Sequence, residues 1–209
     1  MPILCLSQAG QDTLPRYLLG RKGTYLDIGC FHPTYHNNSY SLEMEGWIGL
    51  SIDYQNFSAE FGAKRKNPFL YGDVTTIDWT SVIQSNPFMQ NTIDYISFDV
   101  DDATLPAVNR FPWDRIRFAT MTIEHDQYRF GTTTRDHIRT LLTSHGYTLL
   151  CADVIMPGYG AFEDWWVDMK CVDVTKANNI RCDATSYLDI FKKMDPSPYA
   201  FYCPPPSYG

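Results

Sequence analysis

Several features are missing from this chain, and each absence excludes a class of protein. No apolar stretch is long enough to span a bilayer, and the chain does not open with a basic segment followed by an apolar one, so we expect neither a membrane partner nor a signal peptide. Basic residues are outnumbered: the net charge is −7, and the longest basic cluster is Lys64, Arg65 and Lys66. An acidic protein repels phosphate backbones. We therefore expect no nucleic-acid partner and interpret the basic cluster as the solvated end of a helix.

Cysteine motifs are missing as well. The 6 cysteines are scattered, with no Cys-x-x-Cys pair, which argues against a disulfide framework and against a zinc site. Reduced thiols are typical of the cytoplasm, so we expect that location. The 209 residues, 44% of them hydrophobic, predict one compact domain with its core at about 20–175. A tail rich in proline and tyrosine is predicted over 195–209, and the oligomeric state stays open.

Strand-like runs alternate with helical patterns along the chain. This alternation predicts an α/β fold with a mostly parallel, seven-stranded sheet and helices on both faces. Strands are predicted over 24–28, 48–53, 69–71, 94–99, 118–124, 147–152 and 166–172. Helices are predicted over 39–45, with Asn38 or Ser39 as the N-cap, and over 59–66, 79–85 and 135–145.

The first predicted strand ends in Asp27-Ile28-Gly29-Cys30, and the second ends in Asp53. A glycine in this position lets backbone approach a ligand without a Cβ in the way, and an acid about 20 residues later can accept both hydroxyls of a ribose. The second and third glycines of a dinucleotide fingerprint are absent after Gly29. A ligand that carries adenosine but no pyrophosphate fits this loop, and S-adenosylmethionine (SAM) is the candidate.

The other predicted cofactor contacts follow from position. Asp27, Gly29 and Cys30 are expected to line the methionyl side of SAM, and Tyr54 is expected to join Asp53 at the ribose. Asn38 and Ser39 open the next predicted helix, whose free N–H groups could hold a carboxylate such as that of the methionyl part. Plain helix capping explains these two residues equally well. Asp73 with Val74 is expected at the adenine, with a surface turn as the alternative interpretation.

A second acidic cluster follows the fourth and fifth predicted strands. It comprises Asp99 and Asp101 after the fourth strand, and Glu124, His125 and Asp126 after the fifth. Adjacent parallel strands end side by side where ligands bind, so these groups are expected to face the reacting end. Methyl transfer to a hydroxyl needs a base or a metal. Either His125 is the base, with a supporting role as the alternative, or Asp99, Glu124 and Asp126 hold Mg²⁺ or Mn²⁺. Possible alternative bases are His32 and His36, whereas His137 and His145 are expected at the surface.

Several segments in order resemble the FkbM-type SAM-dependent methyltransferases. They are Leu26-Asp27-Ile28-Gly29-Cys30-Phe31-His32-Pro33, Asn37-Asn38-Ser39-Tyr40, Gly46-Trp47-Ile48-Gly49-Leu50-Ser51-Ile52-Asp53, Ile93-Asp94-Tyr95-Ile96-Ser97-Phe98-Asp99-Val100, Met121-Thr122-Ile123-Glu124 and Gly146-Tyr147. The resemblance implies a Rossmann-like class I methyltransferase fold and SAM as methyl donor. It also implies O-methylation of a small-molecule or glycan acceptor, such as a deoxyhexose like rhamnose, by an enzyme of the kind that viruses encode for work in the host cytoplasm. The family's usual Glu-Gly is Asp101-Asp102 here, which leaves the pocket's shape and its metal open.

Two other classes of function remain. Asp99-Val100-Asp101 matches the Asp-x-Asp pattern of metal-dependent glycosyltransferases, although that interpretation leaves Asp27, Gly29 and Asp53 unexplained. The chain could also be a catalytically degenerate methyltransferase fold that acts as an interaction module. A methyltransferase acting on nucleic-acid bases is disfavoured by the acidic charge and by the lack of an Asn/Asp-Pro-Pro-Tyr motif.

Overall fold

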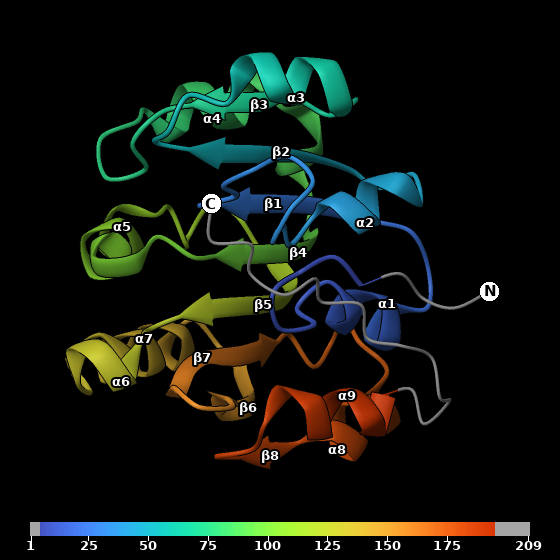
Figure 1. Ribbon diagram of the computed structural model, residues 1–209, viewed down its shortest axis with the longest axis vertical. Coiled ribbons are helices and arrows are strands. Elements are labelled where there is room, and N and C mark those ends of the chain that lie inside the picture. The colour runs from blue at the N-terminus through green and yellow to red at the C-terminus, as the bar shows by residue number, and fades with distance from the viewer. Residues whose placement is uncertain (1–4, 195–209) are drawn as a thin grey trace.

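A sheet of eight strands forms the centre of the protein in a computed structural model that describes residues 5–194. The strand order is β3-β2-β1-β4-β5-β7-β6-β8. Strands β1 to β5 run parallel, whereas β7 pairs antiparallel with both β5 and β6, as the arrows in Figure 1 show. The strands are β1 (Thr24–Ile28), β2 (Ile48–Asp53), β3 (Phe69–Tyr71), β4 (Ile93–Phe98), β5 (Phe118–Glu124), β6 (Thr148–Met156), β7 (Gly160–Val167) and β8 (Cys182–Asp183).

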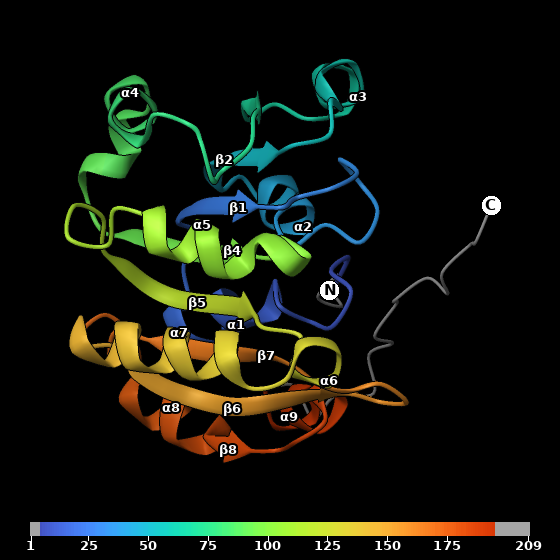
Figure 2. The same cartoon turned by 90° about the vertical axis from the view of Figure 1, so that its left-hand side faces the viewer.

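Helices cover both faces of this sheet (Figure 2). Side chains from α4, α5 and α7 pack on one face, and those from α1, α2, α8 and α9 pack on the other. This arrangement confirms the predicted class I methyltransferase fold, with the two-residue β8 added to the seven expected strands. The helices are α1 (Thr13–Leu19), α2 (Tyr40–Met44), α3 (Ser58–Lys64), α4 (Trp79–Ser85), α5 (Thr104–Arg110), α6 (Gln127–Phe130), α7 (Thr133–Ser144), α8 (Val174–Ile180) and α9 (Tyr187–Met194), with 3₁₀ turns η1 (Pro87–Gln90) and η2 (Asp101–Ala103).

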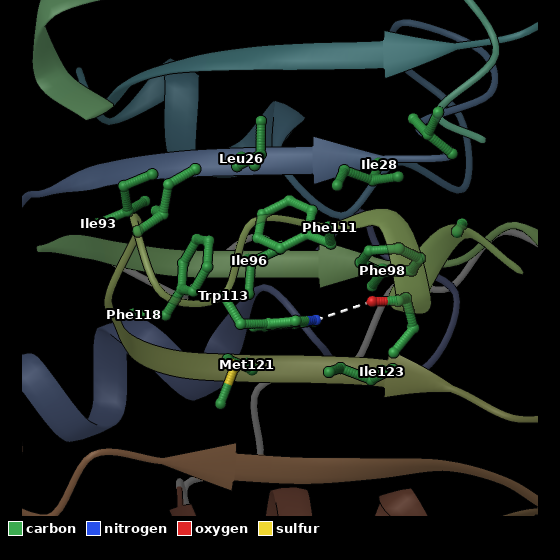
Figure 3. Packing of buried hydrophobic residues seen from close by; sticks show 14 of the residues in the cluster. Leu26, Ile28, Ile93, Ile96, Phe98, Phe111, Trp113, Phe118, Met121 and Ile123 are labelled. Carbon is green, nitrogen blue, oxygen red and sulfur yellow. Dashed lines mark hydrogen bonds between the residues drawn. The ribbon is translucent and has the colours of Figure 1, made fainter. Parts of the chain in front are cut away.

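The face under α4, α5 and α7 is apolar because alternate strand residues project into it. Leu26 on β1 pairs in register with Ile96 on β4, and both are fully buried there. Figure 3 shows Phe111 and Trp113, which follow α5, lying against this layer. The indole N–H of Trp113 donates to the carbonyl of Val108 at 2.9 Å, so the large ring is buried without an unpaired donor. Burial of each such side chain contributes about 1.5–3 kcal/mol to folding.

The opposite face of β1 is polar and is organised by Arg65. Arg65 is 7% exposed and forms an ion pair with Glu43 at 2.6 Å. Its guanidinium also donates to the hydroxyls of Tyr25 and Ser39 at 3.0 and 3.1 Å, and Ser39 in turn donates to Asp27. The prediction that the basic cluster is a solvated helix end is therefore wrong for Arg65. Its guanidinium is buried because several acceptors saturate it.

Three predicted strands differ from the structure, and the sixth, expected over 147–152, is the longer β6 (Thr148–Met156). The last one was expected over 166–172, but β7 covers Gly160–Val167 and runs antiparallel, because a turn joins it directly to β6. The fourth, expected over 94–99, is Ile93–Phe98, so Asp99 lies just beyond the strand end. The helix over 135–145 was also expected too late, since α7 is Thr133–Ser144. No expectation covered α8, although Asp173 caps it by accepting from two backbone N–H groups.

The remaining expectations concern cysteines, membranes and the tail. The five described cysteines are free, as predicted, and they are Cys5, Cys30, Cys151, Cys171 and Cys182. Among residues 5–194 no helix is long and apolar enough to cross a membrane. The proline- and tyrosine-rich tail over 195–209 lies outside the described residues.

Candidate active site

A cavity of about 840 Å³ opens where the parallel strands β1 to β4 end. The loops that follow these four strands supply its walls, as expected for an open parallel sheet. Five of the predicted cofactor contacts and two of the predicted catalytic residues line this cavity. They are Gly29, Asp53, Tyr54, Asp73 and Val74, together with Asp99 and Asp101.

Gly29 forms the floor of the cavity. Its φ is +76°, and a Cβ built on it would lie 1.5 Å from the carbonyl oxygen of Asp99. The backbones of the loops after β1 and β4 are therefore in direct contact. A residue with a Cβ at position 29 would push the two loops apart. The N–H of Gly29 donates to the carbonyl of Ile52, which ties the same loop to β2. Gly29 thus fixes the spacing between the two halves of the predicted site.

Asp53 joins the loops after β1 and β2. Its carboxylate accepts from the backbone N–H of Phe31 at 2.7 Å and from that of Gln55 at 2.8 Å. Each carboxylate oxygen keeps a further lone pair. The structure places Asp53 in the cavity wall, where the ribose was predicted, and Tyr54 stands 69% exposed beside it.

Asp73 and Val74 line the predicted adenine end of the cavity. One carboxylate oxygen of Asp73 accepts from the backbone N–H and the hydroxyl of Thr75 at 2.8 and 2.7 Å. These hydrogen bonds to the Thr75 hydroxyl and N–H lower the pKa of Asp73. Asp73 therefore forms the turn of the alternative interpretation and also lines the cavity, while its contact with adenine stays a prediction.

Asp27 and Ser39 lie behind the cavity floor, outside its lining. Ser39 occupies the N-cap position of α2, but its hydroxyl donates to Asp27 Oδ2 at 2.6 Å and caps nothing. Asp27 is 1% exposed, and its Oδ1 has no hydrogen-bond partner among the described residues. Burial raises the pKa of Asp27 to about 7, although its hydrogen bond with Ser39 opposes this. An unsatisfied buried oxygen behind the glycine loop is a candidate contact for a cationic ligand group.

Cys30 and Asn38 are also buried and do not line the cavity. The side-chain amide of Asn38 donates to the Ser97 hydroxyl on β4 at 2.7 Å, which holds the loop before α2 against the sheet. Burial raises the pKa of the Cys30 thiol well above its usual value. The structure thus gives both residues a place that supports the loop rather than one open to a ligand.

Asp99 and Glu124 meet at the reacting end, as the sequence predicts. Their carboxyl groups lie close enough for each to affect the pKa of the other. Burial, followed by the effects of the neighbouring acids, raises the pKa of Asp99 to about 6. Burial and the adjacent Asp99 charge raise the pKa of Glu124 well above its usual value. Two close carboxyl groups of this kind hold one proton between them near neutral pH.

The metal prediction named Asp99, Glu124 and Asp126, but the carboxylate oxygens that converge within 4.8 Å belong to Asp101, Glu124 and Asp126. Oxygen ligands of this type suit Mg²⁺ or Mn²⁺. Arg129, however, donates to Asp101 at 2.9 Å and to Asp126 at 3.0 Å. The guanidinium therefore already balances two of the three carboxylates, and a metal ion would have to displace it. Arg129 carries no signal in the sequence that would have identified this role.

His125 is not brought into the cavity. It is 1% exposed, and its Nε2 lies 3.4 Å from Asp164, a carboxylate that Arg139 holds through two hydrogen bonds of 2.8 Å. Its Nδ1 accepts from the backbone N–H of Gln127 at 3.2 Å. Because side chains alternate along β5, His125 projects to the side opposite Glu124. The expectation that His125 faces the reacting end is therefore not supported, whereas its alternative supporting role agrees with these contacts.

The other histidines occupy different positions. His36 lines the cavity, and its ring stacks on Tyr35 with centroids 3.9 Å apart. His32 lies in the same loop with Nδ1 at 3.3 Å from the Thr34 N–H. His137 and His145 lie on and just after α7, half-buried at the edge of the protein, and His137 contacts the side chain of Asn109 at 2.7 Å. Gln8 also lines the cavity, and no motif in the sequence pointed to it.

The chain is similar to known methyltransferases in its sequence and in its fold. A model of the methyltransferase FkbM domain matches residues 37–149, more than half of the chain. No curated protein matches the sequence. The TehB-like SAM-dependent methyltransferase from Corynebacterium glutamicum is 16% identical over 71% of this chain and 81% of that chain, with a TM-score of 0.48. The methyltransferase domain of bacterial CtHen1 is 14% identical over 78% and 97%, with a TM-score of 0.45.

The two structural likenesses are too distant to carry an argument about function, so the family rests on the domain match. That match spans Asp53, Asp99 and Glu124, which lie in and beside the cavity. The domain match does not support the interpretation of Asp99-Val100-Asp101 as a glycosyltransferase motif. The loops that carry Gly29 and Asp53 fit a SAM site. The chain belongs to the FkbM methyltransferase family and is a SAM-dependent methyltransferase.

Proposed function

We propose that this protein transfers a methyl group from SAM to a hydroxyl of a neutral sugar, such as a deoxyhexose in a glycan, in the cytoplasm and without a nucleic-acid partner. One observation carries the proposal. The cavity that Gly29 and Asp53 line also contains Asp99, a half-buried acid whose pKa of about 6 suits a general base.

The described residues fit SAM. Gly29 lets the loops after β1 and β4 meet through backbone at the cavity, and Asp53 offers free lone pairs to a ribose. The unpartnered Oδ1 of Asp27 fits the ammonium group of the methionyl part, provided that the loop opens toward it. When bound, SAM supplies a methyl group on a positively charged sulfur. The acids around Asp99 favour a cation at this end of the cavity.

Asp99 acts as the base in this proposal. Above pH 6 its carboxylate is mostly ionised and accepts a hydrogen bond from the acceptor hydroxyl. Bound SAM would supply the methyl group to the hydroxyl oxygen and leave as S-adenosylhomocysteine, and Asp99 would accept the proton that the hydroxyl loses. Glu124, which holds its own proton, donates a hydrogen bond to Asp99 and keeps that carboxylate in place. Solvent then removes the proton from Asp99.

The proposed mechanism needs no metal ion. Asp101 and Asp126 have Arg129 as their counter-ion, so the positive charge that a metal would provide is already present. The predicted Mg²⁺ or Mn²⁺ is thus dispensable in this mechanism.

The test is a methyl-donor assay with the full chain, SAM and a panel of neutral hexosides and deoxyhexosides, read by mass. Asp99→Asn should lower kcat by about 10²–10⁴-fold while S-adenosylhomocysteine (SAH) binds as before. The matched control is Asp114→Asn, the same exchange at a side chain that is 93% exposed. Normal turnover in Asp99→Asn would remove Asp99 as the base. Methylation of another class of acceptor, with every sugar untouched, would reject the sugar hydroxyl as the substrate.

A further inference from the structure

The exposed aromatic side chains of residues 5–194 gather at one edge of the protein. Six tyrosines and phenylalanines are more than a third exposed, and all lie at the edge where the parallel strands end, five in loops or a short helix and Tyr71 as the last residue of β3. Elsewhere on the described surface, no aromatic side chain is exposed to that extent. The six are Phe31, Tyr54, Tyr71, Tyr128, Phe130 and Tyr159.

These aromatics form two groups on opposite sides of the reacting end. The first group lies beside the nucleoside part of the cavity, after β1, β2 and β3. The second group lies beyond Asp101, on α6 and on the turn between β6 and β7. It comprises Tyr128, Phe130 and Tyr159, which we call the aromatic shelf. Figure 2 shows that α6 and the β6–β7 turn lie together at this edge.

The aromatic shelf is held in place by its neighbours. The rings of Tyr128 and Tyr159 meet edge to face with centroids 6.1 Å apart and planes at 67°. A Cβ on Gly160 would lie 3.0 Å from the Tyr128 Cβ, so Tyr128 packs directly over the start of β7. Phe130 carries the Arg129 guanidinium 4.7 Å above its ring. Two exposed tyrosines in such a fixed arrangement present apolar ring surface at little entropic cost.

Arg129 connects this shelf to the reacting end. It bridges Asp101, which lines the cavity, and Asp126, which opens α6. Asp126 is 2% exposed, and its Oδ1 has no hydrogen-bond partner in the described structure. The second oxygen of Glu124 is likewise buried and unpartnered. Carboxylate oxygens that are buried beside an exposed shelf and lack donors are suited to hydroxyl groups from a ligand.

We propose that the aromatic shelf binds the acceptor, and that it selects a neutral, polyhydroxylated ring. A pyranose has C–H groups on its faces and hydroxyls on its rim. The faces fit against Tyr128 and Tyr159, while the rim hydroxyls donate to Asp101 and Asp126. Negatively charged acceptors are repelled by these same acids. A 6-deoxyhexose, with a methyl group in place of one hydroxyl, matches the apolar ring surface better than a hexose does.

This inference rests on the proposed sugar methylation, and its test separates the two. The measurements are the acceptor KM and kcat with a rhamnoside, and SAH affinity by calorimetry, on the full-length protein. Tyr159→Ala and Tyr128→Ala should each raise the acceptor KM by about 3–10-fold, with SAH affinity unchanged. Tyr159→Phe should restore the KM because the ring surface remains. A phosphorylated rhamnose should be a poorer acceptor than the neutral rhamnoside.

Two control variants make the result specific. Leu188→Ala removes an exposed apolar side chain on α9, outside the cavity lining, so it should leave the acceptor KM unchanged. Met44→Ala removes an exposed apolar side chain on α2 and should change neither constant. An unchanged KM in the double variant of Tyr128 and Tyr159 would overturn the shelf while sugar methylation stands. Dimer dissociation in that variant, at unchanged KM, would identify the shelf as a subunit contact instead.

Direct binding gives a readout that needs no turnover. If the wild-type protein binds SAH but methylates no glycoside, the proposed function fails. Saturation-transfer NMR of the rhamnoside with the SAH-loaded protein then tests the shelf by itself. Signal that is present in the wild type and lost in Tyr128→Ala and Tyr159→Ala supports a sugar-binding shelf. No signal in the wild type, or equal signal in the variants, overturns it.

Discussion

Replacement of Asp53 tests the SAM site most directly. In the proposed complex its carboxylate accepts two ribose hydroxyls, and hydrogen bonds to a charged group contribute about 1.5–3 kcal/mol each. Water replaces part of this in the variant, so Asp53→Ala should weaken SAH binding by about 2–4 kcal/mol, or about 30–1,000-fold in Kd. Calorimetry at pH 7.5 measures this effect directly.

The same substitution also removes two structural contacts, which the experiment must separate. Asp53 accepts from the N–H groups of Phe31 and Gln55 at 2.7 and 2.8 Å, and their loss should lower the free energy of unfolding by about 1–3 kcal/mol. Affinity is therefore measured well below the melting temperature of the variant. The matched control is Asp78→Ala, which removes a carboxylate that accepts from the Thr80 N–H and the Ser81 hydroxyl outside the cavity lining. A folded Asp53→Ala protein with the wild-type Kd for SAH would refute the assignment, and tighter binding of NAD than of SAM would refute the cofactor.

Four further outcomes follow from the structure. Gly29→Ala should abolish detectable SAH binding and lower the melting temperature, because a positive φ costs about 1–3 kcal/mol for alanine and the new Cβ meets the Asp99 carbonyl at 1.5 Å. The rate constant kcat/KM should rise with pH through about 6 as Asp99 loses its proton, and a flat profile from pH 5 to 8 would contradict the base. Turnover should survive chelation by EDTA, since Arg129 serves as the counter-ion; recovery only on addition of magnesium would show otherwise. Burial raises the pKa of Glu163 to about 8, so urea unfolding should show stability falling between pH 4.5 and 8, and Glu163→Gln should make this slope shallower.

The nucleoside half of the site could be predicted from the sequence because it depends on local order. Gly29 and Asp53 each end a short buried strand, and parallel neighbours in register bring such ends to one edge. The approach of Asp99 to Glu124 follows from the same rule applied to β4 and β5. No knowledge of side-chain packing is needed for either prediction.

The errors concern residues whose orientation is set by distant contacts. His125 follows Glu124 directly, yet alternation along β5 turns it toward Asp164 and Arg139 on the other side of the sheet. The sequence predicts Arg65 to be solvated. In the structure it is buried and donates to Glu43, which lies more than twenty positions earlier. A periodic sequence pattern cannot predict which residue forms an ion pair with a buried charge, because that residue lies on another helix or strand.

The two faces of the sheet contribute differently to stability and to the position of the site residues. One face is apolar and packs α4, α5 and α7, so it supplies most of the hydrophobic stabilisation. The other face buries Arg65 with Glu43 and Ser39, contacts that fix the segment between β1 and α2. That segment carries Gly29 and borders the cavity, and removing one partner of a buried ion pair leaves the other charge uncompensated. This polar network costs desolvation and sets the position of the glycine loop, whereas the rest of the same face packs α1, α8 and α9 through a second apolar cluster.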